Sequence, residues 1–263
     1  MIVEVLSVWG VASVAMAAAW VWQLRSRDAG IVDVLWAYGV GGAGLWLLAA
    51  GDGDPGRRAV LAVLLALWSL RLGTHLLLDR VLRSRGEDGR YADWRASSGA
   101  RWPLVSGAFF LAQALFVALF AIPAACGAQD PRPWGEPLDW LGLVLWGAGW
   151  SIEALADRQL AAWRRDPAHA GRTCRAGLWR YSRHPNYFGE WLQWLAWPLL
   201  ALGGPAGLWL LLHPLLVLAF LWWFTGIPHC ERRALRSRGD DYRRYQQTTS
   251  PFFPWPPRSE EAS

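Results

Sequence analysis

Long apolar stretches alternate with short, polar, arginine-rich connections along the whole chain. Each apolar stretch is close to the roughly 20 residues that an α-helix needs to cross a bilayer. Seven such stretches are visible, at 3–23, 31–50, 59–79, 103–125, 138–157, 186–203 and 207–228. The pattern predicts an all-α, polytopic membrane protein with seven transmembrane helices.

The first apolar stretch could be mistaken for a signal peptide. It has no basic region before it, it contains Glu4, and it is longer than the apolar part of a signal peptide. We therefore expect it to remain as the first transmembrane helix. Because no internal repeat or low-complexity linker divides the chain, we treat residues 1–263 as a single integral membrane domain.

The composition supports a membrane protein and argues against a soluble one. Hydrophobic residues make up 54% of the 263 residues, and 21 residues are Trp. Trp favours the boundary between lipid and water, where its apolar ring and its single N–H donor are both satisfied. We expect membrane lipid as a partner and no nucleic acid. The three cysteines are scattered, and no CxxC or HExxH pattern predicts a metal site.

The basic residues predict an orientation. All 26 of them are Arg, and all but four lie in the connections on one side of the predicted bundle. The exceptions are Arg71, inside a span, and Arg57, Arg58 and Arg132 on the other side. Because positive residues favour the cytoplasm, we expect the N-terminus outside and the C-terminus in the cytoplasm.

Polar side chains enter the predicted spans near their cytoplasmic ends. Ionisable groups inside a membrane are costly and usually face a cavity or a partner. Each alone could form a structural ion pair or extend to the interface, but four spans contribute them at a similar depth. Together they predict a polar cavity open to the cytoplasm. The residues are Asp33, Tyr38, Arg71, His75, Asp79, Glu153, Asp157, Asn186 and Glu190.

The stretch "RYSRHPNYFGEW", residues 180–191, carries the strongest functional signal. Pro185 suits the first turn of a helix, whose free N–H groups and dipole attract an anion. Basic residues precede this helix, and Asn186 and Glu190 lie one turn apart within it. The pattern predicts a dinucleotide site, with phosphates on the arginines and a neutral amide at the helix. The basic residues are Arg164, Arg172, Arg175, Arg180, Arg183 and His184.

The longer stretch "GLWRYSRHPNYFGEW" resembles the C-terminal signature of the steroid 5-alpha-reductase family, roughly G-G-L-F-x-Y-x-x-x-x-N-F-x-G-E. The matching positions are Gly177, Leu178, Tyr181, Asn186, Gly189 and Glu190. The bacterial branch of that family is similar over most of the chain, including an ending of the "YQQTTSPFFPWPP" type. This resemblance implies a seven-helix monomer in a bacterial inner membrane, with NADPH bound on the cytoplasmic side.

With the basic residues of the motif, the resemblance implies a set of cofactor-binding residues. Asn186 and Glu190 are expected at the nicotinamide end, Asp157 and Arg164 on the preceding helix, and Arg172 near the phosphates. The full set is Arg71, Asp79, Arg80, Arg83, Glu153, Asp157, Arg164, Arg172, Tyr181, Arg183, His184, Asn186, Glu190, Glu231 and Tyr242.

The expected reaction is hydride transfer from NADPH to the C=C bond of a lipophilic enone, such as a 3-oxo-Δ4 steroid. Family members bind the substrate carbonyl with a Glu and a Tyr, and the nearest matches here are Asp33 and Trp68. Trp donates a hydrogen bond but is no proton source. A protonated Asp33 is therefore the expected donor, with Tyr38 or His75 as substitutes.

Two other functions fit parts of the sequence. Membrane methyltransferases of the isoprenylcysteine type share "RHPxYxG" at the same helix start and bind S-adenosylmethionine there. Asn186, Glu190 and the many arginines favour the reductase. A non-enzymatic lipid-binding or transport protein would show inverted repeats or helices broken within the membrane, and the sequence shows neither.

Overall fold

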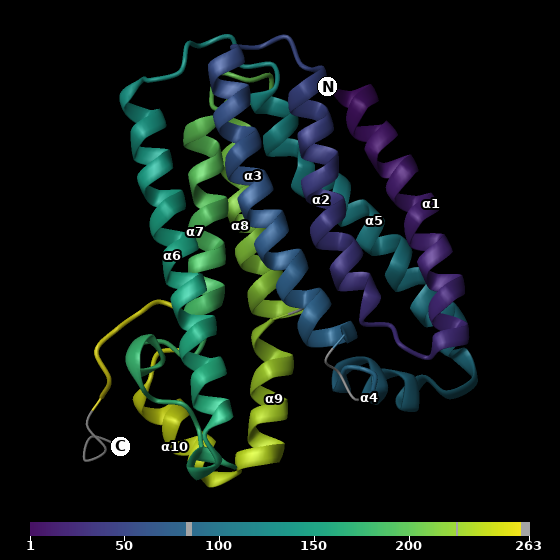
Figure 1. Ribbon diagram of the computed structural model, residues 1–263, viewed down its shortest axis with the longest axis vertical. Coiled ribbons are helices and arrows are strands. Elements are labelled where there is room, and N and C mark those ends of the chain that lie inside the picture. The colour runs from purple at the N-terminus through teal and green to yellow at the C-terminus, as the bar shows by residue number, and fades with distance from the viewer. Residues whose placement is uncertain (83–85, 225, 259–263) are drawn as a thin grey trace. The chain divides into compact units, whose positions relative to one another are not determined.

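A computed structural model describes residues 1–82, 86–224 and 226–258 of the chain. Within these ranges it is helical and has no strands. The α-helices are α1 (Ile2–Ser26), α2 (Ile31–Ala50), α3 (Pro55–Leu76), α4 (Gly89–Ser98), α5 (Trp102–Gly127), α6 (Pro137–Arg165), α7 (Pro185–Leu200), α8 (Leu212–Ala219), α9 (Ile227–Arg238) and α10 (Asp240–Thr248) (Figure 1).

Several short helical segments extend or connect the α-helices. Two are π-helical: η1 (Leu77–Leu82) continues α3, and η6 (Phe220–Phe224) continues α8. Four are 3₁₀ turns: η2 (Gly99–Arg101), η3 (Pro167–His169), η4 (Gly177–Arg180) and η5 (Gly207–Leu211).

The chain divides into two compact units. Unit 1 comprises Met1–Trp134 and Ala201–Gly207, and unit 2 comprises Gly135–Leu200 and Leu208–Ser263. Whether the two units behave as the one domain expected for residues 1–263 stays a prediction.

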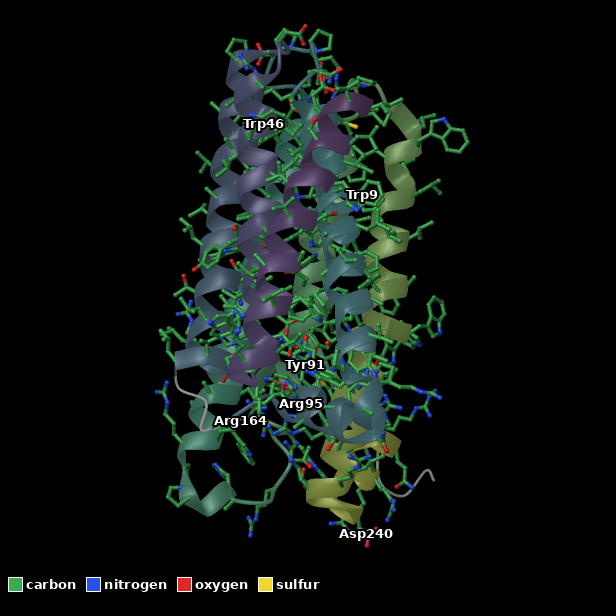
Figure 2. All side chains as sticks on the ribbon, turned by 90° about the vertical axis from the view of Figure 1, so that its right-hand side faces the viewer. Trp9, Trp46, Tyr91, Arg95, Arg164 and Asp240 are labelled. Carbon is green, nitrogen blue, oxygen red and sulfur yellow. The ribbon has the colours of Figure 1, made fainter. Side chains whose placement is uncertain are left out.

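In unit 1, α1 packs along α5, and α2 packs against both α3 and α5. Trp36 of α2 contacts both α3 and α5. Its ring meets Trp68 of α3 and Phe120 of α5 edge-on, at centroid distances of 5.9 and 5.1 Å. Trp9 and Trp46 lie toward one end of this unit, and Tyr91 and Arg95 lie toward the other (Figure 2). Trp9 and Trp46 keep 43% and 49% of their surface exposed, as expected for lipid-facing aromatic residues.

In unit 2, α6 and α7 form the main contact. The two helices approach closely because each has a glycine where they meet: a Cβ built on Gly149 would lie 2.6 Å from the Gly189 carbonyl oxygen. A capping box starts α6, in which the buried Asp139 carboxylate accepts hydrogen bonds from the N–H groups of Gly135 and Glu136 at 3.0 Å.

Five helical stretches are long and apolar enough to cross a membrane. They are Ile2–Ser26, Ile31–Ala50, Pro55–Leu82, Gly89–Gly127 and Gly207–Arg238. Five of the predicted spans fall inside them, so the structure supports an integral membrane protein with several transmembrane helices.

The other two predicted spans are helical but are not among these five stretches. The span at 138–157 lies within α6, where acidic side chains lower the mean hydropathy. The span at 186–203 corresponds to α7, which has 16 residues and ends at Leu200. At about 1.5 Å per residue, such a helix is shorter than the roughly 30 Å hydrocarbon core. The seven-span count and the orientation therefore remain predictions.

Candidate functional site

A line of acidic side chains on α6 meets amide side chains on α7 inside unit 2. Gln193 Nε2 donates to Glu153 Oε2 at 2.8 Å, and Asn186 Nδ2 donates to Asp157 Oδ1 at 3.2 Å. The close approach of the helices at their glycines makes both contacts possible. Asn186 Oδ1 is buried and has no hydrogen-bond partner among the described residues. A buried acceptor of this kind is costly unless a ligand or water donates to it.

Glu190 lies one turn beyond Asn186 on the same face of α7. Its side chain is buried, with 9% of the residue exposed, and its Oε1 accepts a hydrogen bond from Trp194 Nε1 at 2.8 Å. The structure thus joins Asn186 to Asp157 and places Glu153 against Gln193 of α7, whereas Glu190 accepts from Trp194 on its own helix.

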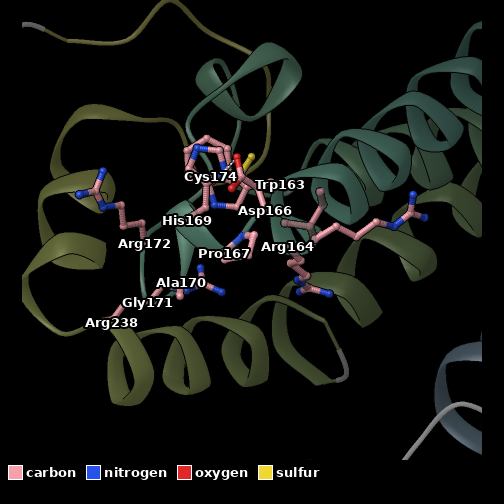
Figure 3. A pocket seen from close by; sticks show the side chains of 12 residues that line it. Trp163, Arg164, Asp166, Pro167, His169, Ala170, Gly171, Arg172, Cys174 and Arg238 are labelled. Carbon is pink, nitrogen blue, oxygen red and sulfur yellow. Dashed lines mark ion pairs between the residues drawn. The ribbon is translucent and has the colours of Figure 1, made fainter.

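Four arginines of unit 2 are among the residues that line a cavity of about 320 Å³ at the end of α6 (Figure 3). Its lining includes the guanidinium-bearing residues Arg164, Arg165, Arg172 and Arg238, against a single carboxylate, Asp166. Arg164 and Arg172 were predicted from the sequence. Arg164, Arg165 and Arg172 are exposed and Arg238 is half-buried, so the surface around the cavity is positively charged, which favours a ligand with several negative charges.

One wall of this cavity is aromatic. The rings of Trp163 and His169 stack with centroids 3.5 Å apart and planes 7° from parallel, and His169 Nδ1 lies 3.5 Å from Asp166 Oδ2 (Figure 3). Cys174 also lines the cavity, and burial raises the pKa of its thiol, which keeps it protonated. Apart from its arginines, the cavity therefore offers flat ring surfaces and an unreactive thiol.

The cavity and the amide cluster lie along one face of α6. Glu153, Asp157, Leu160 and Arg164 follow one another at helical spacing, and the last two line the cavity. Arg164 lies eleven positions after Glu153, which corresponds to about 16 Å along the helix axis. This face changes from hydrogen-bonding groups at one end to positive charge at the other.

Arg183 and His184 take part in an internal cluster of polar side chains. Arg183 donates to Glu231 Oε1 at 2.7 Å and to the carbonyl oxygens of Gln246 and Thr249 at 2.8 and 3.1 Å. His184 Nε2 lies 3.4 Å from the same Glu231 oxygen. These groups bind one another and the polypeptide, and the cofactor contact expected of Arg183 and His184 stays a prediction.

Glu231 is the centre of this cluster. It also accepts from Gln246 Nε2 at 2.8 Å and from the Tyr242 hydroxyl at 3.5 Å. Burial raises the pKa of Tyr242, so its hydroxyl stays protonated and can donate. Burial lowers the pKa of His184, with Glu231 opposing and Arg183 adding to the shift. The cluster ties α9 and α10 to the connection that precedes α7.

Tyr181, another predicted cofactor residue, has 42% of its surface exposed, and its carbonyl accepts from the Trp255 N–H at 2.9 Å. Asp241 of α10 binds the connection between α6 and α7. Its carboxylate accepts from the Thr173 N–H at 2.7 Å and from Arg175 at 3.0 Å. Burial opposes ionisation of Asp241, but these hydrogen bonds and the charge of Arg175 outweigh it and lower the pKa. These contacts fix the connection without using the Tyr181 ring.

The predicted catalytic residues lie in unit 1. Asp33 forms ion pairs with Arg80 and with Arg90, whose Nη2 is 2.9 Å away, and it accepts from the Tyr91 hydroxyl at 2.9 Å. Two arginines stabilise the carboxylate, which accepts hydrogen bonds and cannot donate them. Whether Asp33 donates to a substrate carbonyl stays a prediction. Arg80, expected at the cofactor, is engaged in this same cluster.

Trp68 and Tyr38 lie in the packed part of unit 1. Trp68 is buried, with 2% exposed, edge-on to Trp36, which makes it a packing residue. The Tyr38 hydroxyl lies 3.0 Å from Thr74 Oγ1, and its ring fills the space beside Gly73. Tyr38 keeps a hydroxyl that can donate.

Arg71, His75 and Asp79 follow one another on the continuous helix formed by α3 and η1. Arg71 is half-buried, whereas His75 and Asp79 are exposed. Asp79 lies in the π-helical turns, which differ in pitch from the α-helical spacing assumed for the shared face. Arg83, the remaining predicted residue, lies outside the described ranges.

The comparisons with known proteins identify a family. The family described as "Protein of unknown function (DUF1295)" has a model that matches residues 19–249. The chain belongs to this family. No curated protein and no solved structure matches it. The matched range contains both the amide cluster and the arginine cavity.

Several residues of these sites were not predicted from the sequence. Gln193 and Trp194 could have been found, because they lie three and four residues after Glu190 on an adjoining face of the helix. Arg165 lies in the basic run after α6, but nothing local distinguishes it from an ordinary charged loop residue. Arg238 lies on α9, at least 64 residues along the chain from the other residues of the cavity. Tyr91 is 58 residues from its partner Asp33, so no local pattern indicates either contact.

The cluster and the cavity together define a chemistry for unit 2. One end can hydrogen-bond a neutral group through Asn186 Oδ1, and the other can hold anions. Among the described residues, no group of three or more His, Cys, Asp or Glu side chains could hold a metal ion.

Proposed function

We propose that this protein is an NADPH-dependent membrane reductase that transfers hydride to the C=C bond of an enone lipid, with a 3-oxo-Δ4 steroid as the best candidate. The resemblance of residues 177–190 to steroid 5-alpha-reductases motivates the proposal. Its main structural support is the α6 face that leads from Glu153 and Asp157 to the arginine cavity.

The ligand that suits this face is elongated, neutral at one end and multiply anionic at the other. NADPH has a carboxamide at one end and a diphosphate and a 2′-phosphate toward the other. S-adenosylmethionine carries a sulfonium cation and no phosphate, so four arginines around one cavity would disfavour it. The charge of the cavity thus supports the reductase over the methyltransferase.

The donors and acceptors of unit 2 fit the carboxamide. Asn186 Oδ1 is a buried acceptor with no donor among the described residues, as is Gln193 Oε1, and Asn186 would accept from the carboxamide N–H₂. A free Asn amide could also donate to the carboxamide carbonyl. Asn186 Nδ2 instead donates to Asp157, which holds the amide in this orientation. Glu190, held by Trp194, would be a second acceptor on the same face.

When bound, NADPH would supply a hydride for the β carbon of the enone. The chain must orient the substrate, exclude water and place a donor at the carbonyl oxygen, where enolate charge develops. Since Asp33 is held in two ion pairs, Tyr38 is the better candidate for this donor, followed by His75. Trp68 would shape the apolar surroundings. In the proposed orientation, seven helices cross a bacterial inner membrane with the cofactor site facing the cytoplasm.

Turnover tests the reaction itself. Detergent-purified protein mixed with NADPH and a 3-oxo-Δ4 steroid should consume the cofactor, followed by absorbance, and give a product heavier by two hydrogens. Transfer of a methyl group from S-adenosylmethionine, with no cofactor oxidation, would overturn the reductase proposal.

Calorimetry tests the cofactor. NADPH should bind more tightly than NADH, with affinity falling as salt rises. Replacing Arg238 with Gln should weaken NADPH binding about tenfold, the effect of losing one charge-assisted hydrogen bond. Arg243→Gln is the matched control, because Arg243 is exposed and pairs with Asp240 on α10. Equal affinity for NADPH and NADH would contradict the assignment of the cavity.

A further inference from the structure

Residues 251–258, with the sequence PFFPWPPR, expose large aromatic side chains at the surface of unit 2. Trp255 is 70% exposed and Phe253 is 49% exposed. Tyr181, whose carbonyl accepts from the Trp255 N–H, is 42% exposed, and its neighbour Arg180 is also exposed. Exposed Trp, Tyr and Arg side chains together are typical of a membrane–water interface.

A single buried residue anchors this segment. Phe252 is fully buried, and its carbonyl accepts from Ser182 Oγ at 2.7 Å. Its ring meets those of Phe188, Trp191 and Trp222 at centroid distances of 5.8 to 6.0 Å. Trp222 belongs to the candidate span Gly207–Arg238, just before its sequence becomes polar in α9. The anchor therefore holds the segment where an apolar helix gives way to charged residues.

The backbone of the segment suits a partly apolar environment. Four of its eight residues are Pro and have no N–H to satisfy. Of the others, Trp255 donates its N–H to Tyr181 and Arg258 donates its N–H to the Thr248 carbonyl, both at 2.9 Å. An unsatisfied N–H among lipids is costly, so these bonds lower the cost of placing Trp255 and Arg258 at the interface.

A cavity of about 240 Å³ lies between this segment and the end of α10. It is lined by residues 246–251 and by Trp255, Pro256 and Arg258. The lining residues include Arg258, which carries a guanidinium group, Gln247, which carries amide donors, and Trp255, which carries an indole ring. A cavity with these groups suits a phosphate attached to an apolar body.

We propose that this cavity binds the headgroup phosphate of an anionic phospholipid from the surrounding bilayer. Arg258 and the polar side chains at the end of α10 hold the phosphate, and Trp255 and Phe253 lie among the glycerol and upper acyl groups. The exposed Arg180 adds to the preference for a lipid with net negative charge. The site is separate from the arginine cavity of α6 and does not depend on a cofactor.

Native mass spectrometry of the full-length protein, titrated with phosphatidylglycerol or phosphatidylcholine, tests the site. The wild type should retain one phosphatidylglycerol molecule at least about tenfold more tightly than phosphatidylcholine. Arg258→Gln and Trp255→Ala should each weaken phosphatidylglycerol binding by about tenfold. Both side chains are exposed, so the melting temperature should stay unchanged.

Two matched controls and a competitor complete the experiment. Arg101→Gln and Trp9→Ala remove an exposed Arg and an exposed Trp from unit 1 and should leave this binding unchanged. Equal loss in the control variants, or undiminished binding in Arg258→Gln and Trp255→Ala, would overturn the proposal. So would displacement of the lipid by millimolar inorganic phosphate, because the site would then recognise the free anion.

Discussion

At the scale of single residues, Glu190 is the most direct test of the amide cluster. Glu190→Gln keeps an oxygen that can accept from Trp194 Nε1, so the variant should fold with an unchanged melting temperature. A Gln is a weaker acceptor than a carboxylate, so the proposed contact to the carboxamide should lose about 1–3 kcal/mol. We expect turnover to fall roughly 5- to 150-fold.

The fragment 2′-phospho-ADP-ribose separates this effect from a general loss of binding. It lacks the nicotinamide, so Glu190→Gln should bind it as the wild type does. Normal turnover in this variant would remove Glu190 from the proposed site, and unfolding would show that its role is structural.

His184 predicts how stability depends on pH. Because burial lowers its pKa below the usual value of about 6.5, the unfolded chain binds the proton more readily than the folded one. Stability from this residue is therefore full above about pH 6.5 and decreases as the pH falls below it, by at most about 1.4 kcal/mol per pH unit. Its charged neighbours, Glu231 and Arg183, act in opposite directions on the shift.

Melting temperatures between pH 7.5 and 5.5 measure this dependence. His184→Gln removes the titrating group, so its melting temperature should fall less over this range than that of the wild type. The exposed His229 gives the control, and His229→Gln should keep the wild-type slope. A His184→Gln variant with the full slope would assign the pH dependence to other groups.

At the scale of elements, the contact between α6 and α7 depends on two glycines. A Cβ on Gly149 would lie 2.6 Å from the Gly189 carbonyl oxygen and 2.9 Å from the Gln193 nitrogen. Neither atom can move without displacing the helix backbone. We expect Gly149→Ala to destabilise the protein by about 1–3 kcal/mol and to lower its melting temperature.

Gly147 is a matched control on the same helix. A Cβ there meets nothing within 4 Å, so Gly147→Ala should be neutral or stabilising by up to about 1 kcal/mol, the difference in helix propensity. If both variants melted alike, the close approach of the two helices would be wrong. Because this contact positions Asn186 beside Asp157, Gly149→Ala should also reduce NADPH binding.

At the scale of the whole molecule, the arginine distribution predicts sidedness. Single cysteines at Ser97 and Ser237 should be labelled from the cytoplasm, and single cysteines at Asp52 and Pro131 from outside. These four positions are exposed. Cys230 is exposed and would itself be labelled, so it is first replaced with Ser, whereas Cys126 and Cys174 are buried.

Intact cells and opened cells, treated with a membrane-impermeant maleimide, distinguish the two sides. Labelling of Ser97→Cys in intact cells would reverse the proposed orientation and would move the connections rich in arginine to the outside. A cytoplasmic cofactor could not then reach them.

The sequence by itself determined the helical fold and the residues that a single helix brings together. Apolar stretches of about 20 residues predicted five of the candidate spans, because length and hydropathy are local properties. The spacing of four residues placed Glu153 beside Asp157, and Asn186 beside Glu190, because residues i and i+4 share one face of a helix. The basic stretch after α6 also predicted a cluster of positive charge, which the cavity at Arg164 and Arg172 contains.

Only the tertiary structure decided which partner each polar side chain takes. Arg183 binds Glu231 across 48 residues, and Asp33 binds Arg90 across 57, so no local pattern indicates either pair. The structure therefore places Arg183 in an internal ion pair and Asp33 between two arginines, neither of which the sequence predicted. A charged side chain inside a protein takes the nearest group that offsets the loss of water, and which group is nearest depends on how distant helices pack.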